Sequence, residues 1–281
     1  MSPAMLAGVA GWPIHQSLSP VMHNYWLRRH GLNGSYVALP IAPEHFGQCM
    51  NVLPLMGFAG VSVTVPHKLA AFALSSSLDA DAEATGAVNT LVFAGNEVRG
   101  SNTDVRGFAA SLAESLGENA AKAGAAVVLG AGGAARAVVL ALARGGAPEI
   151  RLLNRTRAKA EAIASSLKVP GRLAVMKWGE WKRAFDEAGL LVNTTSLGMV
   201  GKPALEFDLD NLPRAAAVAD IVYNPLQTAL LKAASERGHR TMDGLGMLMH
   251  QAVPAFAGWF GITPSVTPEL RAELVKALSN A

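Results

Sequence analysis

The chain has 281 residues, and a typical size of roughly 100–200 residues per domain predicts two domains rather than one compact core. Hydrophobic residues make up 51% of the sequence and charged residues 16%, which excludes a disordered chain and favours well-buried elements. The net charge of +3 is small and scattered, so it does not indicate binding to nucleic acid, and it suits small anionic ligands equally well.

The N-terminal residues 1–14 are apolar and contain no basic residue, since the first is Arg28. A secretory signal begins with basic residues, so we interpret this segment as a first strand. The one cysteine, Cys49, excludes an intrachain disulfide and is expected to be a small buried hydrophobe. The longest apolar stretch, residues 123–143, approaches membrane-spanning length but is interrupted by glycines and by Arg136. We therefore expect a cytoplasmic protein that binds no membrane.

Short apolar runs alternate with amphipathic ones in the first part of the chain. Strands are predicted at residues 5–10, 36–39 and 60–65, and a hairpin at residues 88–93 and 97–99 turns around Gly95-Asn96. A helix begins at Ser19-Pro20, where Ser19 is expected to act as the cap, and it ends at Gly31. This order predicts an α/β layer with parallel strands.

The pattern becomes more regular after residue 105. Strands are predicted at residues 127–129, 150–153, 173–175, 190–193 and 218–222, and helices at residues 135–144, 156–167 and 228–237. Such a βαβ series is typical of a doubly wound sheet. The C-terminal part is predicted to be helical, at residues 245–260 and from Thr267-Pro268 to residue 278, and its aromatic cluster is expected to be core.

The clearest motif is the run VVLGAGGAAR at residues 127–136, which places glycines after a strand and opens a helix. Gly130 permits a tight turn, Gly132 lets the backbone approach a pyrophosphate, and Ala135 allows close contact between helix and strand. The phosphates would meet amide N–H groups at the positive end of the helix. The motif therefore predicts a dinucleotide site.

The end of the next strand indicates which dinucleotide is bound. An acidic residue there would bind the ribose hydroxyls of NAD, but this chain has Asn154, Arg155, Thr156 and Arg157. A guanidinium can bind a 2′-phosphate with two hydrogen bonds, whereas an acid would repel it. NADP is therefore the predicted cofactor; the alternative is that Arg155 and Arg157 are solvated loop residues.

Polar residues are embedded in apolar surroundings throughout the first part of the chain. They supply hydroxyl, amide, ammonium and carboxylate groups suited to a small polyhydroxylated acid: Ser17, Ser19, Thr64, Lys68, Asn89 and Asp104.

These residues belong to motifs in which the sequence resembles the shikimate dehydrogenase family. The matching motifs are PIHQSLSP at 13–20, VTVPHK at 63–68, GAVNT at 86–90, NTD at 102–104, GAGGAAR at 130–136, NRT at 154–156, and DGLGM at 243–247 with Gln251. They run in order over nearly the whole chain, so coincidence is excluded.

The resemblance implies a role for particular side chains. Lys68 and Asp104 would form the catalytic pair. The substrate carboxylate would be held by Ser17, Ser19 and Tyr223, and the ring hydroxyls bound, or the pair oriented, by Thr64, Asn89 and Gln251. The cofactor-binding residues would be Gly130, Ala131, Gly132, Gly133 and Ala134 at the phosphates, Asn154, Arg155, Thr156 and Lys159 around the 2′-phosphate, and Ile221 and Gly244 beside the nicotinamide.

The family's fold implies an α/β protein of two domains with a cleft between them. The N-terminal substrate-binding domain would comprise residues 1–104, completed by C-terminal helices at 241–281, and a Rossmann-like, doubly wound NADP-binding domain would comprise residues 105–240. The implied reaction is reversible hydride transfer between NADP(H) and the pair 3-dehydroshikimate and shikimate, in the biosynthesis of aromatic amino acids. The seven histidines show no ligand spacing, so no metal is expected.

The physical chemistry agrees with these roles. Negative charge grows on the C3 carbonyl oxygen during reduction, and the Lys68 ammonium can stabilise it and donate the proton. Asp104 is expected to anchor the ammonium and keep it charged. Three positions depart from the usual family pattern: Gln16 and Ser62, where His and Asn are common, and Lys159, where Arg is usual. Arg157 is close enough in the sequence to compensate for Lys159.

Three alternatives remain. One is a broader quinate/shikimate dehydrogenase that accepts NAD or quinate, and another is a relative acting on a different cyclic hydroxy acid. The third, of a different class, is a non-catalytic protein that senses its ligand, which the presence of both Lys68 and Asp104 disfavours. We expect a monomer or homodimer without a nucleic-acid partner.

Overall fold

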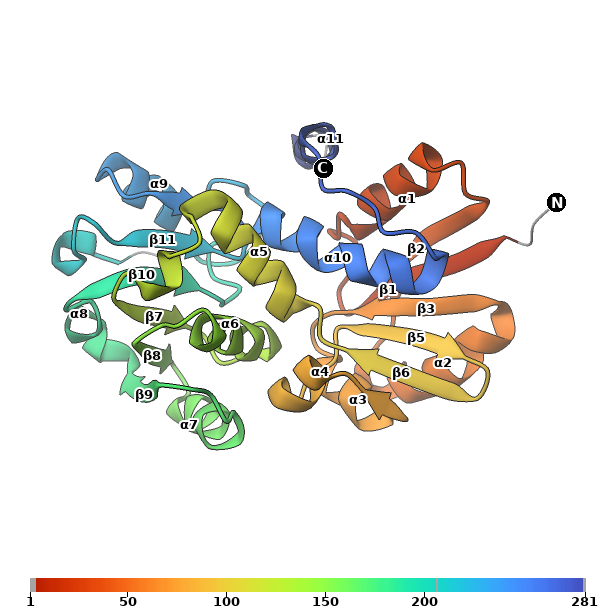
Figure 1. Cartoon of the computed structure of the whole chain (residues 1–281), viewed down its shortest axis with the longest axis horizontal. Coiled ribbons are helices and arrows are strands. Elements are labelled where there is room, and N and C mark those ends of the chain that lie inside the picture. Colours follow the sequence, from red (N-terminus) through yellow and green to blue (C-terminus); the bar gives the residue numbers. More distant parts are fainter. Residues whose placement is uncertain (1–3, 206, 280–281) are drawn as a thin grey trace. The chain divides into compact units, whose positions relative to one another are not determined.

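The structure is a computed structural model that describes residues 4–205 and 207–279. These residues form two compact units, shown in Figure 1. The first unit comprises Met1–Thr103 and Gln251–Ala281, and the second comprises Asp104–His250. These bounds differ from the sequence-based division at Asp104 and at residues 241–250, all of which belong to the second unit. There Gly246 approaches Ser111 so closely that a Cβ at Gly246 would lie 2.4 Å from the Ser111 hydroxyl oxygen.

The first unit is built on a six-stranded mixed sheet. Its strands are β1 (Met5–Gly11), β2 (Gly34–Pro40), β3 (Phe58–Val63), β4 (Ser77–Leu78), β5 (Thr90–Ala94) and β6 (Glu97–Ser101), in the order β2-β1-β3-β5-β6-β4. Strands β1, β2 and β3 are parallel, whereas β5 is antiparallel to β3 and β6. The predicted hairpin is confirmed, with Gly95 at φ 61° in its turn. Since β5 runs antiparallel to both of its neighbours, the expectation of a layer of parallel strands holds only for part of the sheet.

The helices of the first unit come from both ends of the sequence. They are α1 (Ser19–Arg29), α2 (Phe46–Val52), α3 (Lys68–Leu74), α4 (Ala80–Thr85), α11 (Pro268–Ser279) and the C-terminal part of α10 (Gly244–Phe260), with 3₁₀ turns at Pro43–His45 and Leu53–Met56. The expectation that Ser19 caps α1 was wrong. Leu18 already has helical angles (φ −81°, ψ −6°), so Ser19 lies inside the first turn and its amide donates to Ser17 Oγ at 3.3 Å.

The two faces of this sheet are covered by different helices. Val61 and Val63 belong to a core cluster with Phe46 of α2 and Ala71 of α3. The adjacent position, Gly60, faces the other side of the sheet, where Trp259 of helix α10 packs. A Cβ at Gly60 would lie 2.3 Å from Nε1 of Trp259, so any larger residue would push α10 away from the sheet. The Trp259 indole donates to the Leu91 carbonyl at 2.9 Å. The C-terminal aromatic cluster is therefore core, as expected.

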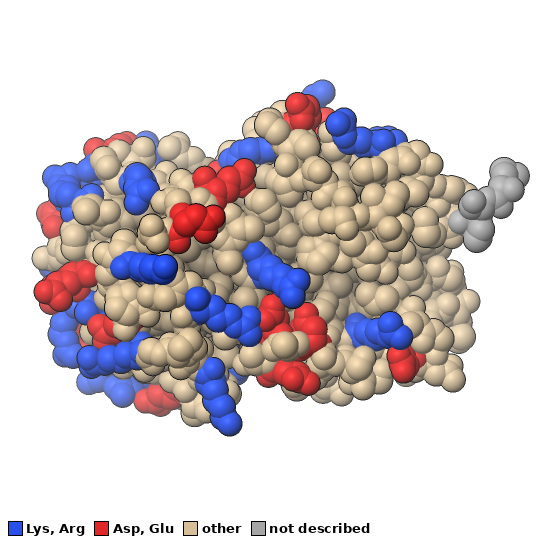
Figure 2. Space-filling model, in the orientation of Figure 1, with Lys and Arg blue, Asp and Glu red and all other residues tan. Residues whose placement is uncertain are grey.

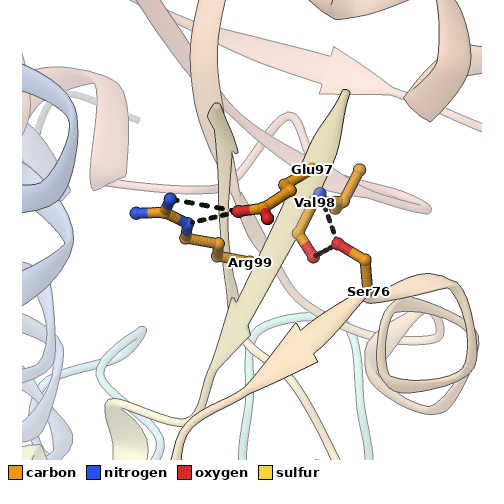
Figure 3. Close-up of polar contacts among 4 residues, drawn as sticks. All are labelled: Ser76, Glu97, Val98 and Arg99. Atoms are coloured by element: carbon orange, nitrogen blue, oxygen red, sulfur yellow. Dashed lines mark hydrogen bonds and ion pairs between the residues drawn. The ribbon is translucent and has the colours of Figure 1, made fainter. Parts of the chain in front are cut away.

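The edge of the sheet at β4 and β6 is held by hydrogen bonds to a serine (Figure 3). Ser76 Oγ accepts from the Val98 amide at 2.9 Å and donates to the Val98 carbonyl at 3.1 Å. Arg99 pairs with Glu97 at 3.0 Å, but both side chains are mostly exposed. An exposed ion pair contributes little to stability. The serine side chain instead adds to backbone hydrogen bonds at this edge, such as that from the Ser76 amide to the Val98 carbonyl at 2.8 Å.

The second unit is a six-stranded, wholly parallel sheet. Its strands are β7 (Ala125–Leu129), β8 (Glu149–Asn154), β9 (Arg172–Lys177), β10 (Ala188–Asn193), β11 (Ala217–Asp220) and β12 (Thr241–Met242), in the order β12-β11-β10-β7-β8-β9. Its helices are α5 (Asp104–Leu116), α6 (Gly133–Arg144), α7 (Arg157–Ser166), α8 (Trp181–Ala184), α9 (Ala229–Glu236) and the start of α10, with 3₁₀ turns at Ala120–Lys122, Trp178–Glu180 and Leu209–Asn211. This confirms the doubly wound fold; α5 and β12 were not predicted.

The strand order determines where a ligand would bind in this unit. Chain order reverses between β7 and β10, which lie side by side at the centre of the sheet. In doubly wound sheets, ligands bind outside the carboxyl ends of the strands at such a reversal. The ends of β7 and β10 therefore mark the expected dinucleotide site.

The surface and the apolar stretches agree with the composition. Figure 2 shows Lys and Arg side chains interspersed with Asp and Glu over the second unit, with no extended field of one sign on the face drawn. Residues 123–143 contain strand β7 and most of helix α6. Within residues 4–205 and 207–279, no helix is both long and apolar enough to cross a membrane.

Candidate active site

Three polar side chains of the first unit form a buried hydrogen-bonded cluster. Asn89 Nδ2 donates to Thr103 Oγ1 at 2.9 Å and to Gln251 Oε1 at 3.3 Å. Asn89 Oδ1 accepts from the Thr103 amide at 2.8 Å. Thr103 Oγ1 and Gln251 Oε1 are also joined at 3.3 Å. The amides of Asn89 and Gln251, which are 162 positions apart, thus hold each other in fixed orientations.

The two residues expected to be catalytic both begin helices. Lys68 is the first residue of α3 in the first unit, and its carbonyl accepts from the Val88 amide at 3.0 Å. Asp104 is the first residue of α5 in the second unit and is buried. A carboxylate is favoured at a helix N-terminus by the helix dipole. Asp104 directly follows Thr103, whose amide donates a hydrogen bond to Asn89 Oδ1. The buried cluster therefore restrains the backbone next to Asp104.

His67 has a structural role despite its position beside Lys68. Its ring stacks on Phe46 with centroids 4.5 Å apart, and its Nε2 lies 2.7 Å from the Ile41 carbonyl oxygen. The ring is buried. These contacts explain why a histidine stands beside Lys68 without a part in the chemistry assigned to Lys68.

The remaining substrate-site candidates of the first unit lie after strand β3 or at the start of helix α1. Thr64 follows β3; its amide donates to the Ala10 carbonyl at 2.9 Å, and its carbonyl accepts from the His67 amide at 2.9 Å. Ser17 and Ser19 are half-buried and buried at the start of α1. All three backbone positions are therefore fixed by hydrogen bonds or by helix geometry.

The unusual serine at position 62 is explained by a core contact. Ser62 Oγ accepts a hydrogen bond from the Tyr36 hydroxyl at 2.8 Å. Tyr36 is fully buried and stacks on His23 with ring centroids 4.0 Å apart. Burial lowers the pKa of His23 to about 3, so this ring is neutral. Ser62 therefore serves the core beneath β2 and β3, and its departure from the family pattern has a structural reason.

The glycine loop of the second unit leaves room for phosphate groups. Gly130 has φ 110°, and a Cβ there would lie 2.7 Å from Thr194 Oγ1. Gly132 precedes the first turn of α6 and is exposed, and no atom lies within 4 Å of where its Cβ would stand. Open space thus faces the N-terminus of α6, where amide N–H groups bind anions. The loop fits the pyrophosphate of a dinucleotide, with Ala131, Gly133 and Ala134 completing it.

The loop after β8 carries the residues expected at the 2′-phosphate. Asn154 ends β8, and its Nδ2 donates to the Thr156 carbonyl at 2.8 Å, which closes a tight turn. Arg155, Thr156 and Lys159 are exposed. Arg157 pairs with Glu161 across one helical turn at 2.7 Å. Compensation for Lys159 by Arg157 would require this pair to break.

A buried network at the ends of β10 and β11 was missed by sequence reasoning. Asp220 Oδ1 accepts from Asn193 Nδ2 at 2.9 Å and from the Val222 amide at 3.0 Å, and Oδ2 accepts from Thr228 Oγ1 at 2.8 Å. Asp220 is 0% exposed. Burial raises the pKa of Asp220 to about 6, although all three hydrogen bonds act to lower it. Asn193 ended one predicted strand and Asp220 lay within another, 218–222, so polar residues in otherwise apolar strands were the available signal.

The segment after Asp220 contains two further candidates, Ile221 and Tyr223. The Ile221 amide donates to the Asn193 carbonyl at 3.1 Å. Gly244 packs on this segment, since a Cβ there would lie 2.2 Å from the Ile221 carbonyl oxygen. The candidates Ile221, Tyr223 and Gly244 are thus brought to one place at the end of β11.

The raised pKa of Asp220 predicts a pH dependence of stability. A carboxyl group that binds its proton more tightly in the fold than in the unfolded chain stabilises the fold at low pH. This contribution is lost as pH rises through the folded pKa of about 6. With an unfolded pKa of ~3.9, the loss is roughly 3 kcal/mol. We expect the stability of Asp220→Asn relative to wild type to rise by this amount between about pH 4 and about pH 7.

Urea unfolding at several pH values measures this difference. Asp186→Asn is the matched control, because Asp186 is exposed. A wild-type-to-variant difference that does not change with pH would show that the Asp220 carboxyl is not perturbed.

The described part of the chain holds no group of three or more His, Cys, Asp or Glu side chains placed to bind a metal ion. The site candidates are therefore amides, hydroxyls, one ammonium group, carboxylates and a phosphate-binding loop. These groups suit recognition of a small hydroxylated acid and a dinucleotide.

Comparisons with known proteins agree with this chemistry. The family model for the shikimate dehydrogenase substrate binding domain matches residues 9–91, and that for shikimate / quinate 5-dehydrogenase matches residues 111–200. The curated shikimate dehydrogenase (NADP(+)) of Methylobacterium radiotolerans is 53% identical over 97% of this chain and 97% of its own.

Solved structures are similar over the full length. The crystal structure of shikimate dehydrogenase from Aquifex aeolicus has a TM-score of 0.86 at 35% identity, covering 100% of this chain and 99% of its own. Quinate dehydrogenase from Corynebacterium glutamicum, in complex with NAD, has a TM-score of 0.86 at 30% identity, covering 98% and 99%.

Proposed function

The chain belongs to the shikimate dehydrogenase family, and from this membership we propose that it catalyses the reversible, NADP-dependent interconversion of 3-dehydroshikimate and shikimate. Reduction to shikimate is the direction that serves the biosynthesis of aromatic amino acids. The observation that carries the proposal is the phosphate-binding loop at the end of β7, in a chain whose relative is 53% identical over 97% of its length.

NADPH, when bound, supplies the hydride to the C3 carbonyl carbon of the substrate. Negative charge then grows on the carbonyl oxygen, and we assign its stabilisation and protonation to the Lys68 ammonium. Asp104 is assigned the role of holding that ammonium in place. Both residues begin helices whose first turns have fixed backbone hydrogen bonds, which supports a role that depends on position.

Substrate recognition is assigned to the polar residues of the first unit and to Tyr223. The hydroxyls of Ser17, Ser19 and Tyr223 would bind the carboxylate. Thr64, Asn89 and Gln251 would bind the ring hydroxyls. The buried hydrogen bonds between Asn89 and Gln251 support this role, because preorganised amides lose little conformational freedom when a ligand binds.

Selection of NADP over NAD is assigned to the loop after β8. Asn154, Arg155, Thr156 and Lys159 would surround the 2′-phosphate, with the Arg155 guanidinium as its main ligand. We expect Arg155→Ala to raise the KM for NADP by ~10-fold or more while changing that for shikimate little, because charge-assisted hydrogen bonds contribute ~1.5–3 kcal/mol. Steady-state kinetics with NADP and shikimate varied in turn measures the two KM values separately.

Arg157→Ala is the matched control for that experiment, because Arg157 is already paired with Glu161. It should leave the KM for NADP nearly unchanged. Equal increases in both KM values for Arg155→Ala would mean that Arg155 does not bind the 2′-phosphate.

The activity itself is tested by following absorbance of NADPH with shikimate, quinate or neither, each with NADP and with NAD. Fast reduction with shikimate and NADP alone supports the proposal. Because quinate dehydrogenase from Corynebacterium glutamicum has the same TM-score as the shikimate enzyme, quinate with NAD is the alternative that the assay must separate. No turnover with any pair would leave a ligand-sensing protein as the better hypothesis.

We further propose that the protein works in the cytoplasm, as a monomer or homodimer, without a nucleic-acid partner. The single cysteine and the net charge of +3 support this view. Light scattering on the purified protein measures the oligomeric state.

A further inference from the structure

Asp220 lies at the carboxyl end of β11, where its buried carboxylate closes a loop of the chain. One of its oxygens accepts from the Val222 amide at the start of the loop, and the other from Thr228 Oγ1 at its end. The loop between them, residues 221–227, contains Ile221 and Tyr223. One side chain therefore fixes both ends of the segment that carries these two candidates.

The same carboxylate ties the loop to the neighbouring strand. Asn193 ends β10, and its Nδ2 donates to Asp220 Oδ1 at 2.9 Å and to the Leu197 carbonyl at 3.2 Å. The Asn224 carbonyl accepts from the Val200 amide at 2.9 Å. Asn193 and Asp220 thus join two adjacent loops at the carboxyl edge of the sheet, next to the reversal of strand order.

A carboxylate suits this place because three donors converge on it. It accepts at both oxygens, whereas the amide of Asn accepts at only one. Thr228 Oγ1 also accepts from the Leu231 amide at 3.3 Å, which caps α9, so its own proton is directed to Asp220. No ion pair to Asp220 is found among the residues that the structure describes, and burial of an unpaired carboxylate costs stability. A group that costs stability beside a candidate site is better explained by function than by folding.

We propose that Asp220 is a positioning residue of the dehydrogenase, whose carboxylate fixes the loop 221–227 so that Ile221 and Tyr223 keep their places beside the nicotinamide and the substrate carboxylate. This inference rests on the function proposed above. Asp220 itself is assigned no contact with either ligand; it acts through the Val222 amide and the Thr228 hydroxyl.

The test compares Asp220→Asn, which removes the carboxylate oxygen that accepts the Thr228 proton, with Thr228→Val, which removes the hydroxyl that donates it. Thr228→Ser keeps the hydroxyl and is the conservative variant, and Ser235→Ala on the exposed side of α9 is the control. For each we would measure kcat, the KM for shikimate, thermal unfolding, and binding of 2′,5′-ADP, which is the adenosine part of NADP with its 2′- and 5′-phosphates and lacks the nicotinamide. If Asp220→Asn does not fold, Thr228→Val still tests the idea.

We expect kcat to fall ~10-fold to ~100-fold in Asp220→Asn and Thr228→Val, with a raised KM for shikimate, because small misplacements of positioned groups have effects of this size. Binding of 2′,5′-ADP should stay within about twofold of wild type, and Thr228→Ser should restore most of the activity. The double variant Asp220→Asn/Thr228→Val should have a kcat close to that of either single variant, because both substitutions act on the same hydrogen bond.

Two results would overturn the inference. One is that the wild type is active and Thr228→Val has the same kcat and the same KM for shikimate as the wild type. The other is a parallel loss of 2′,5′-ADP binding, thermal stability and kcat, which would indicate a general structural role. A wild type that binds 2′,5′-ADP but turns over no substrate would instead reject the proposed function, and with it this role for Asp220.

Discussion

Lys68→Ala is expected to lower kcat by ~10²-fold or more while changing the KM for shikimate little. The ammonium is assigned to the carbonyl oxygen, where charge develops only as hydride is transferred. Its contribution is therefore larger in the transition state than in the ground state. Initial rates with saturating NADP measure the effect.

Two comparisons make this result interpretable. Lys68→Arg keeps the positive charge but changes its shape and is a poorer proton donor, so it should also have low activity. Leu69→Ala is the control, because Leu69 is the exposed neighbour on the same helix turn. Retention of more than roughly a tenth of wild-type kcat by Lys68→Ala would reject the assignment, since loss of one such group normally costs more.

Gly130→Ala is expected to destabilise the second unit strongly. Alanine rarely adopts the φ of 110° found at Gly130, and its Cβ would lie 2.7 Å from Thr194 Oγ1 and 3.1 Å from the Thr194 backbone. Backbone strain of ~1–3 kcal/mol and overpacking of ~1–3 kcal/mol together predict a loss of roughly 2–6 kcal/mol in the free energy of unfolding. Urea unfolding measures this loss.

Gly132→Ala provides a matched contrast in the same loop. Gly132 has φ −95°, and its Cβ would stand in open space, so the fold should tolerate the substitution. The methyl group would nevertheless occupy space assigned to the pyrophosphate, so NADP should bind more weakly. If Gly130→Ala is as stable as Gly132→Ala, the constraint at Gly130 is absent.

Contiguous motifs carried most of the correct sequence predictions. The run at residues 127–136 has its strand, its turn and its helix start within ten positions, and the structure confirms all three. Likewise Gly95-Asn96 predicted the hairpin of β5 and β6. Local backbone preferences and short-range hydrogen bonds decide such features, so neighbouring residues suffice to predict them.

Other features depended on residues far apart in the chain. The partnership of Asn89 with Gln251 spans 162 positions, and that of Tyr36 with Ser62 spans 26.

Two local features were also predicted wrongly or missed. The prediction that Ser19 caps α1 was wrong because the preceding residue, Leu18, already has helical angles. Helix α5 was missed because the sequence has no capping signal at its start other than Asp104.

The sequence by itself determined the family, the two-unit α/β organisation and the position of the phosphate-binding loop, because each depends on residue type and local spacing. Only the tertiary structure decided that Asp220 is buried with three donors and that Ser62 belongs to the core. Desolvation and long-range hydrogen bonds depend on what surrounds a group in space, and the order of residues along the chain does not specify those surroundings locally.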